Sequence, residues 1–263
     1  MFSLKDRIVF ITGASSGIGE ACAEAFARLG ARLLLCSRQS ARLTPVADRL
    51  RSEHAADIRT FSLDVTDAAA VQSAISDLPD DWAAIDVLIN NAGKALGVDK
   101  SFESRLDHIN GMIDTNVRGM LHVMRAVIPG MVARDKGHVI QIGSAAGHWV
   151  YPGGTVYCAS KFAVHALSEG LKMDLHGTKV RVSSVDPGLV ETEFSVVRFD
   201  GDRKRAAAVY EGITPLTGAD VADAVVYCAT RPPHVNINEI LMMCVDQSSA
   251  TLVNREKPGG PTT

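Results

Sequence analysis

The sequence lacks the segments that would direct a chain to a membrane or out of the cell. Its 263 residues contain no run of roughly 18 apolar residues of the kind that spans a bilayer. The N-terminus also lacks the apolar stretch and small-residue cleavage site of a secretory signal. We therefore expect a cytoplasmic protein with no membrane partner.

Neither the cysteines nor the positive charges indicate a metal site or a nucleic-acid partner. The five cysteines are odd in number and form no C-x-x-C pair, which favours free thiols over disulfides or a zinc framework. The net charge is -3, and the 27 Lys and Arg residues are scattered along the chain. We predict no metal site and no nucleic-acid partner, and expect a small-molecule substrate.

Strand-like and helix-like segments alternate along the chain. The predicted strands are short apolar runs without clean alternation, as expected of strands covered on both faces; they span residues 7–12, 31–36, 58–65, 85–93, 138–144, 180–188 and 238–245. Such alternation predicts an α/β protein with a Rossmann-type, doubly wound, seven-stranded parallel sheet and helices on both faces. We expect a single domain over residues 1–253 and a flexible C-terminal tail over residues 254–263.

A glycine-rich turn, "TGASSGIG", follows the first predicted strand. Gly13, Gly17 and Gly19 would let the backbone approach a pyrophosphate, and the helix that follows supplies free N–H groups and a positive dipole end. The alternative is a tight strand-to-helix connection without a ligand. No Lys-Ser/Thr pair follows the turn, so a P-loop nucleoside triphosphatase is disfavoured.

The second predicted strand ends without the acidic residue with which NAD enzymes hold the ribose 2′-hydroxyl. Ser37 and Arg38 stand there instead, and a guanidinium can bind a 2′-phosphate through its fork of donors. The sequence therefore favours NADP, unless Arg38 merely projects into water. Asp64 and Val65, at the end of the third strand, are placed to contact the adenine.

Several ordered motifs together resemble the short-chain dehydrogenase/reductase family over residues 5–250. They are "TGASSGIG" (12–19), "NNAG" (90–93), Asn116 in "DTNVRG", Ser144, "YCASK" (157–161) and "DPGLVET" (186–192). The resemblance implies an NAD(P)-dependent oxidoreductase whose catalytic set is Asn116, Ser144, Tyr157 and Lys161. The cofactor contacts that it implies, with those argued above, are Gly13, Ser15, Ser16, Gly17, Ile18, Gly19, Arg38, Asp64, Val65, Asn91, Ala92, Gly93, Tyr157, Lys161, Pro187, Gly188, Val190 and Thr192.

Tyr157 and Lys161 have the spacing of one helix face, in a helix expected to begin near Val156. Bringing a phenol from a pKa of about 10 to near 7 takes roughly 4 kcal/mol, and a unit charge at about 4 Å supplies roughly that at an effective dielectric of 20. We thus expect Lys161 and an oxidised nicotinamide to make Tyr157 the acid or base. The alternatives are an exposed Tyr–Lys pair and a simple turn hydroxyl at Ser144. A hydrolase is disfavoured, because "IGSAAG" does not match the G-x-S-x-G motif of that class.

Asn116 lies in a long apolar segment, residues 111–132, which predicts a continuous helix. A buried amide costs free energy unless it is paired. The family resemblance implies that Asn116 holds a water in a proton relay, and the alternative is an amide satisfied within the core.

The segment after the sixth strand is expected to cover the substrate. Its sequence resembles that of NADP-dependent 3-hydroxy acid dehydrogenases, whose substrates carry a carboxylate. We expect Ser144 and Tyr157 to contact the reacting oxygen and Arg198 to bind the carboxylate, although Arg198 could equally face water. His148 and Trp149 either line the pocket or only pack, and the glutamates at 191 and 193 are expected to face water.

Two other functions stay open. The same residues could serve an NADPH-dependent reductase of another small aldehyde or ketone, for example a sulfonated aldehyde. A non-catalytic NADP sensor is the third reading, and the complete catalytic set argues against it.

The helix after Tyr157 carries two apolar stripes and must bury more than one face. The stripes are Phe162, Ala166, Gly170 and Met173, and Ala163, Leu167, Leu171 and Leu175. The family resemblance implies that a partner subunit covers part of this helix, so we expect a homotetramer.

Overall fold

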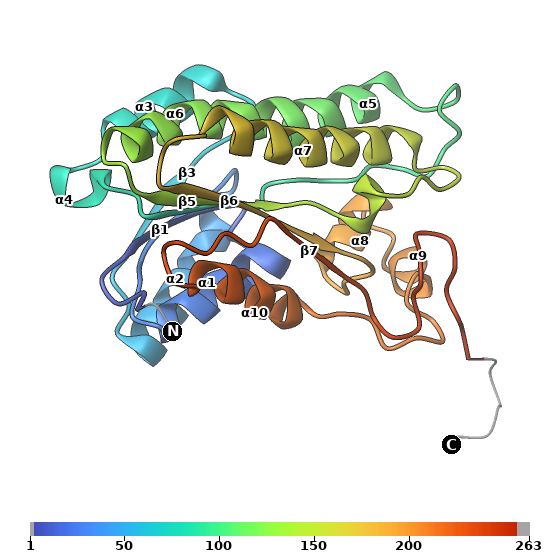
Figure 1. The fold of residues 1–263 in the computed structure, drawn as a ribbon. Coiled ribbons are helices and arrows are strands. Elements are labelled where there is room, and N and C mark those ends of the chain that lie inside the picture. The colour runs from blue at the N-terminus through green and yellow to red at the C-terminus, as the bar shows by residue number, and fades with distance from the viewer. Residues whose placement is uncertain (1–2, 257–263) are drawn as a thin grey trace.

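A seven-stranded parallel sheet forms the centre of the protein. The computed structural model describes residues 3–256, and its strand order is β3-β2-β1-β4-β5-β6-β7 (Figure 1). The strands are β1 (Ile8–Thr12), β2 (Arg32–Ser37), β3 (Ile58–Ser62), β4 (Val87–Asn90), β5 (Gly137–Ile142), β6 (Val180–Pro187) and β7 (Glu239–Met242). Each lies within or across a predicted strand, and the predicted fold is confirmed.

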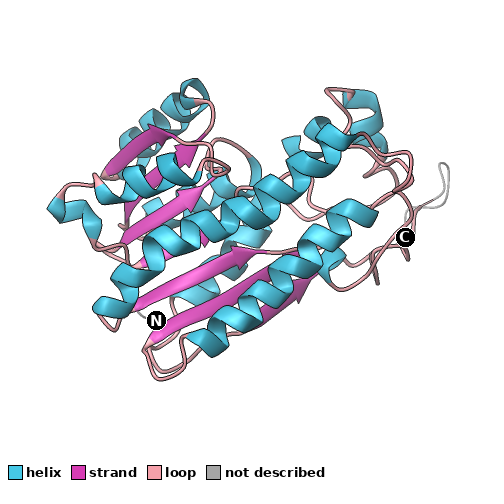
Figure 2. Cartoon of the chain, turned by 90° about the horizontal axis from the view of Figure 1, so that it is seen from above, coloured by secondary structure: helices cyan, strands magenta, loops and turns pink. Residues whose placement is uncertain are grey.

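Helices cover both faces of this sheet, in two layers (Figures 1 and 2). One layer contains α1 (Gly17–Arg28), α2 (Ser40–His54) and α10 (Gly218–Ala229). The other contains α3 (Ala68–Ser76), α5 (Leu106–Ile113), α6 (Met120–Ala133) and α7 (Thr155–Asp174). The short elements are α4 (Asp80–Ala83), the π-helical η1 (Asp114–Gly119), the 3₁₀ turn η2 (Ala145–Gly147), α8 (Glu193–Arg198) and α9 (Arg203–Ala208).

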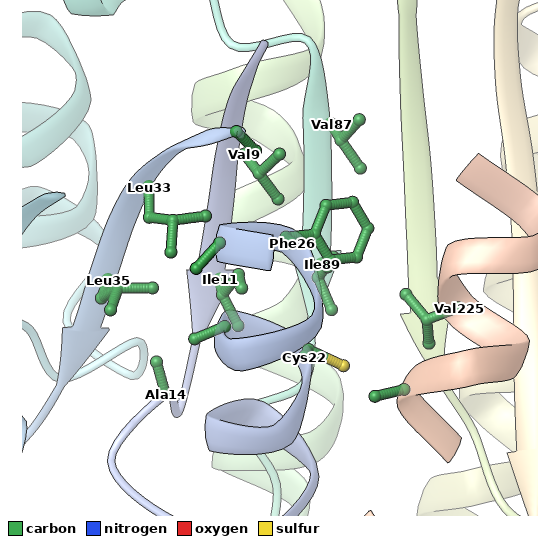
Figure 3. Close-up of a cluster of buried hydrophobic side chains, with 14 of the residues drawn as sticks. Val9, Ile11, Ala14, Cys22, Phe26, Leu33, Leu35, Val87, Ile89 and Val225 are labelled. Atoms are coloured by element: carbon green, nitrogen blue, oxygen red, sulfur yellow. The ribbon is translucent and has the colours of Figure 1, made fainter. Parts of the chain in front are cut away.

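The central strands are buried on both faces, which is why they read as continuous apolar runs. All five residues of β1 are buried. Val9 and Ile11 pack toward α1 and α10, against Phe26 and Val225 (Figure 3), whereas Phe10 joins the cluster on the other face. Burying a side chain of this size contributes about 1.5–3 kcal/mol, so alternate residues of one strand stabilise both helical layers.

The strand order reverses between β1 and β4, and this places a crevice at the carboxyl ends of these two strands. Asn91 joins the two ends, because its Nδ2 donates to the carbonyl oxygens of Thr12 at 2.9 Å and Gly13 at 3.1 Å. The Thr12 hydroxyl in turn accepts from the backbone N–H of Asn91 and Ala92. The glycine-rich turn and the "NNAG" segment are therefore held together at the crevice.

The helix predicted over residues 111–132 is interrupted by the π-helical segment η1. Its wider turn contains Asn116, which is buried. Such segments are common at functional sites because they displace one residue from the regular helical face.

The first residues of the predicted tail are bonded to the rest of the chain. Asn254 N donates to Asp246 O at 2.7 Å, and Glu256 N donates to Gly212 O at 2.9 Å. Residues 257–263 lie outside the described part of the chain, so a flexible tail stays a prediction for them. Between residues 3 and 256, no helix combines the length and apolar character needed to cross a membrane.

Candidate active site

A cavity of about 500 Å³ opens at the carboxyl ends of the strands. It brings together nearly all the residues predicted for the site, from the glycine-rich turn at one end to α8 at the other. The predicted residues that line it are Gly13, Ser15, Ser16, Gly17, Ile18, Arg38, Asp64, Val65, Asn91, Ala92, Gly93, Ser144, Tyr157, Lys161, Pro187, Gly188, Val190, Thr192 and Arg198. Gly19 and Asn116 lie outside the lining.

The glycine-rich turn has the backbone that a phosphate site needs. Gly13 has φ +66° and Gly17 has φ +59°, values that a residue with a Cβ rarely adopts. A Cβ at Gly19 would lie 2.3 Å from the carbonyl oxygen of Gly13, so only glycine lets α1 approach the turn. Ser16 precedes α1 in an extended conformation, and its side chain makes no capping hydrogen bond. The N–H groups of the first turn are thus available to an anion.

Three cationic side chains line the nucleotide end of this cavity: Arg38, Arg42 and Lys94. Arg38 follows β2, as predicted, and Arg42 lies in the first turn of α2. Burial lowers the pKa of the Lys94 amine, and the nearby charge of Arg38 lowers it further. The cluster has the charge required by the 2′-phosphate of NADP. The position of Arg42 just after Arg38 in the sequence could have indicated it, whereas the contribution of Lys94 depends on the tertiary fold.

Tyr157 is almost fully buried at the catalytic end of the cavity. Its ring packs edge-on against Phe194, with centroids 5.8 Å apart. Burial is the largest influence on the phenol and raises its pKa well above the usual value, while a hydrogen bond with Ser144 acts in the opposite direction. In the protein alone, burial keeps Tyr157 protonated, and the expectation that Lys161 and an oxidised nicotinamide together make the phenol an acid or base near neutral pH stays a prediction.

The Lys161 ammonium group lies beside the Tyr157 ring. Its Nζ is 5.9 Å from the centroid of that ring and donates to the carbonyl oxygen of Ile142 at 2.8 Å. Burial lowers the pKa of Lys161 to about 8, and the negative charge of Asp186 opposes this shift. Lys161 is therefore predominantly charged at pH 7 and loses much of that charge above pH 8.

Ser144 stands between β5 and η2. Its hydroxyl accepts from the backbone N–H of Ala146 at 3.1 Å, which caps the 3₁₀ turn, and it also bonds to Tyr157. The alternative of a simple turn hydroxyl thus accounts for the contact with Ala146 but not for the bond with Tyr157. The pair presents two hydroxyl groups to the same part of the cavity.

Asn116 is satisfied entirely by protein groups. Its Oδ1 accepts from Lys94 N at 2.8 Å, and its Nδ2 donates to Lys94 O and to Ser160 Oγ, both at 2.9 Å. These bonds attach η1 to the segment after "NNAG" and to α7. Asn116 is therefore a positioning residue in this structure, and its expected role in holding a water stays a prediction.

Arg198 reaches the cavity from α8. Its Nη2 donates to the Tyr151 hydroxyl at 2.9 Å and its Nε to Gly97 O at 3.2 Å. The guanidinium carbon lies 5.8 Å from the centroid of the Tyr157 ring. A cation held this close to the phenol is placed to meet an anionic substituent on a substrate, which favours the binding interpretation over a solvated arginine.

Several aromatic residues in the cavity were not predicted. Tyr151, Phe194 and Tyr210 line it, and Tyr210 Oη donates to Val190 O at 2.8 Å. The sequence signal that could have predicted Tyr151 as a cavity residue is its position between Ser144 and Tyr157. His148 and Trp149 do not line the cavity.

The two glutamates expected to face water differ in their surroundings. Glu191 is exposed, whereas Glu193 lines the cavity and pairs with Arg203 at 3.2 Å.

The fold and the site define a dinucleotide-binding oxidoreductase, and comparisons place the chain in a family. Residues 7–202 match the model of the short chain dehydrogenase family. The chain belongs to this family.

Close relatives have named activities. The chain is 46% identical, over 93% of its length and 98% of the relative, to NADP-dependent 3-hydroxy acid dehydrogenase YdfG of Salmonella typhi. It is 43% identical, over 95% of its length and 99% of the relative, to sulfoacetaldehyde reductase 2 of Chromohalobacter salexigens. The closed form of a serine dehydrogenase complexed with NADP+ superposes with a TM-score of 0.88 at 43% identity, covering 95% of this chain and all (100%) of the other.

The cationic cluster leads to a prediction about cofactor choice. Replacing Arg38 with alanine should weaken NADPH binding about 10- to 100-fold, since a hydrogen bond to a charged group contributes roughly 1.5–3 kcal/mol. NADH binding should change less than about threefold, because NADH has no 2′-phosphate. Fluorescence titration of both cofactors measures the two constants.

The matched control is Arg28→Ala, which removes an exposed arginine outside this cavity. Equal losses of NADPH and NADH affinity in Arg38→Ala would contradict the assignment.

Proposed function

We propose that the protein is an NADP-dependent oxidoreductase that interconverts a small 3-hydroxy acid and the corresponding semialdehyde or ketone. One observation carries the proposal. A single cavity joins the glycine-rich turn and Arg38 to Tyr157 and Arg198. It therefore offers a dinucleotide site, a proton donor and a cation for an acidic substrate in one continuous space.

The cofactor, when bound, supplies or accepts the hydride, and the chain supplies the proton chemistry. Tyr157 is protonated at neutral pH because burial raises its pKa. It donates this proton to the carbonyl oxygen of a substrate during reduction and recovers it during oxidation. Ser144, bonded to Tyr157, donates a hydrogen bond to the same oxygen and stabilises the charge that develops there.

Lys161 holds the nicotinamide ribose in this proposal. Its carbonyl partner, Ile142, is the last residue of β5, so the ammonium group is fixed at the carboxyl end of this strand. Gly93, which lines the cavity, lies close to both Asn116 and Lys161, since a Cβ at Gly93 would be 3.4 Å from Asn116 Oδ1 and 3.9 Å from Lys161 Nζ.

Arg198 supports an anionic substrate. Its guanidinium group can bind a carboxylate through two parallel hydrogen bonds, and the serine, allo-threonine and 3-hydroxypropionate class of substrates carries that group. A sulfonate satisfies the same donors, so an NADPH-dependent reductase of a sulfonated aldehyde is the second candidate, favoured by the 43% identity to the Chromohalobacter salexigens enzyme. A non-catalytic NADP sensor would have no use for Arg198 beside Tyr157.

The proton-transfer role predicts the effect of removing the hydroxyl oxygen of Tyr157. Tyr157→Phe should lower kcat at least about 100-fold, because general acid catalysis contributes about 10²- to 10⁴-fold, while NADPH affinity changes less than about threefold. Tyr227→Phe serves as the control, since Tyr227 is an exposed tyrosine of α10 outside the cavity. Surviving turnover in Tyr157→Phe would disprove the assignment.

A substrate panel tests the proposed reaction. Serine, allo-threonine, 3-hydroxypropionate and 3-hydroxyisobutyrate are oxidised with NADP, sulfoacetaldehyde is reduced with NADPH, and simple alcohols provide the uncharged comparison. Arg198→Gln should raise KM for the anionic substrates about 10- to 100-fold, as expected for a lost charge-assisted bond, and leave the alcohols unchanged.

The control for Arg198 is Arg105→Gln, which changes an exposed arginine outside the cavity. A wild-type preference for uncharged alcohols would overturn the acidic-substrate proposal, and NADPH binding without any turnover would favour the sensor.

We also propose that the protein is a cytoplasmic homotetramer. The first of the two stripes is exposed on α7, with Phe162 41% and Met173 71% accessible, whereas Leu171 and Leu175 of the second stripe are buried in this chain. The five cysteines are free and buried, which suits a reducing compartment.

Light scattering coupled to size exclusion tests the assembly. The wild type should have about four times the 28.0 kDa mass of one chain, and Phe162→Glu should reduce it because a buried, unpaired charge is costly. Leu29→Glu, beyond α1 on the other face of the sheet, should not reduce it. A single-chain mass for the wild type would refute the proposal.

A further inference from the structure

A second cluster of chemically capable side chains lies outside the cavity. It consists of His148 after η2, His165 on α7, Asp186 on β6 and Glu239 on β7, and none of the four lines the active-site cavity. One nitrogen or oxygen from each residue lies within 4.8 Å of the others. Four separate elements thus contribute to one compact group of donors.

We propose that this cluster binds one divalent transition-metal ion, with zinc as the best match. Zinc bonds to imidazole nitrogen and carboxylate oxygen are about 2.0–2.2 Å long, so neighbouring ligands of a tetrahedral site lie roughly 3.3 Å apart. In the structure, His148 Nε2 is 2.8 Å from Asp186 Oδ2 and 3.7 Å from Glu239 Oε1, and His165 Nδ1 is 3.3 Å from Glu239 Oε2. These separations bracket the tetrahedral value.

The charge of the cluster also fits a divalent cation. Two carboxylates and two neutral imidazoles carry a charge of -2, which one such ion neutralises. Asp186 is only 2% exposed, and its two oxygens contact His148 Nε2 and Ser184 Oγ. In the described part of the chain, no lysine or arginine forms an ion pair with Asp186 or Glu239. Because a buried carboxylate requires compensation, a cation is the chemical group that this arrangement favours.

A comparison cluster in the same chain shows what an ion-pair network looks like instead. Glu24, Glu53 and His54 also place their ligand atoms within 4.8 Å of one another. Arg49 pairs with both glutamates, and Arg28 Nε lies 2.9 Å from Glu24 Oε1. Guanidinium groups already supply the positive charge there. The carboxylates of the His148 cluster form no ion pair with a lysine or arginine among the described residues, and Lys161 acts on Asp186 only through its nearby charge.

The proposed ion would connect the segments that carry the active site. His148 follows Ser144 by four residues, His165 follows Lys161 by four, and Asp186 directly precedes Pro187. A bound ion would therefore tie η2, α7 and β6 together beside the cavity without entering it, and would also attach the edge strand β7. Its role is structural, and stabilisation follows from binding to the folded state alone.

The test measures zinc itself and does not depend on the proposed reaction. Untagged protein is stripped with a chelator and dialysed, and zinc binding is then measured by calorimetric titration and by metal analysis after gel filtration. We expect one zinc per chain and a higher Tm with zinc than with equal magnesium, because imidazole ligands disfavour magnesium.

Two variants and one control assign the site. His165→Ala and Glu239→Gln should each lower zinc affinity at least about 10-fold, the lower limit seen even for residues that only support metal ligands. Both side chains are about one-third exposed, with 32% and 35% accessibility, so the variants should fold; circular dichroism and NADPH titration check this. His54→Ala, from the comparison cluster, should bind zinc like the wild type.

Either of two outcomes would overturn the proposal. One is wild-type protein that retains less than one zinc per chain after gel filtration. The other is unchanged zinc affinity in folded His165→Ala and Glu239→Gln.

Discussion

The parallel sheet and the reversal of its order between β1 and β4 impose the constraint on which the rest of the structure depends. Parallel strands place all their carboxyl ends at one edge, and the reversal opens a crevice there because successive connections leave in opposite directions. The amide of Asn91 bonds to the carbonyls of Thr12 and Gly13 across this point. The glycine-rich turn and the proposed catalytic residues Ser144, Tyr157 and Lys161 can therefore line one cavity although they are far apart in the sequence.

Burial at this edge decides the protonation of the catalytic pair. It raises the pKa of Tyr157 and lowers that of Lys161 to about 8, because a site removed from water disfavours both the phenolate and the ammonium. The protein thus provides a protonated phenol and a lysine whose charge is sensitive to its surroundings. Asp186, near Lys161, opposes the loss of that charge. The same carboxylate contributes to the proposed zinc site, so one buried acidic residue outside the cavity acts on Lys161 and belongs to the proposed zinc ligands.

Local patterns predicted much of the molecule. The five central strands were recognisable because burial on both faces requires continuous apolar residues, and the turn containing Gly13 and Gly17 was recognisable because its positive φ values favour glycine. Arg38 followed from its position after β2. The π-helical turn at Asn116 was not predictable, since it depends on hydrogen bonds between Asn116 and two residues far from it in the sequence, Lys94 and Ser160. The pKa of Tyr157 depends on packing by distant elements, including Phe194.

The sequence by itself determined the class of fold, the dinucleotide turn and the residue types available for proton transfer, because each depends on neighbours within a few positions. Only the tertiary structure decided that Lys161 bonds to Ile142, that Arg198 reaches Tyr157, and that Asn116 is fully paired. It also assembled the cluster of His148, His165, Asp186 and Glu239. No local spacing marks that cluster, because its members come from four elements that meet only when β6, β7 and α7 pack together.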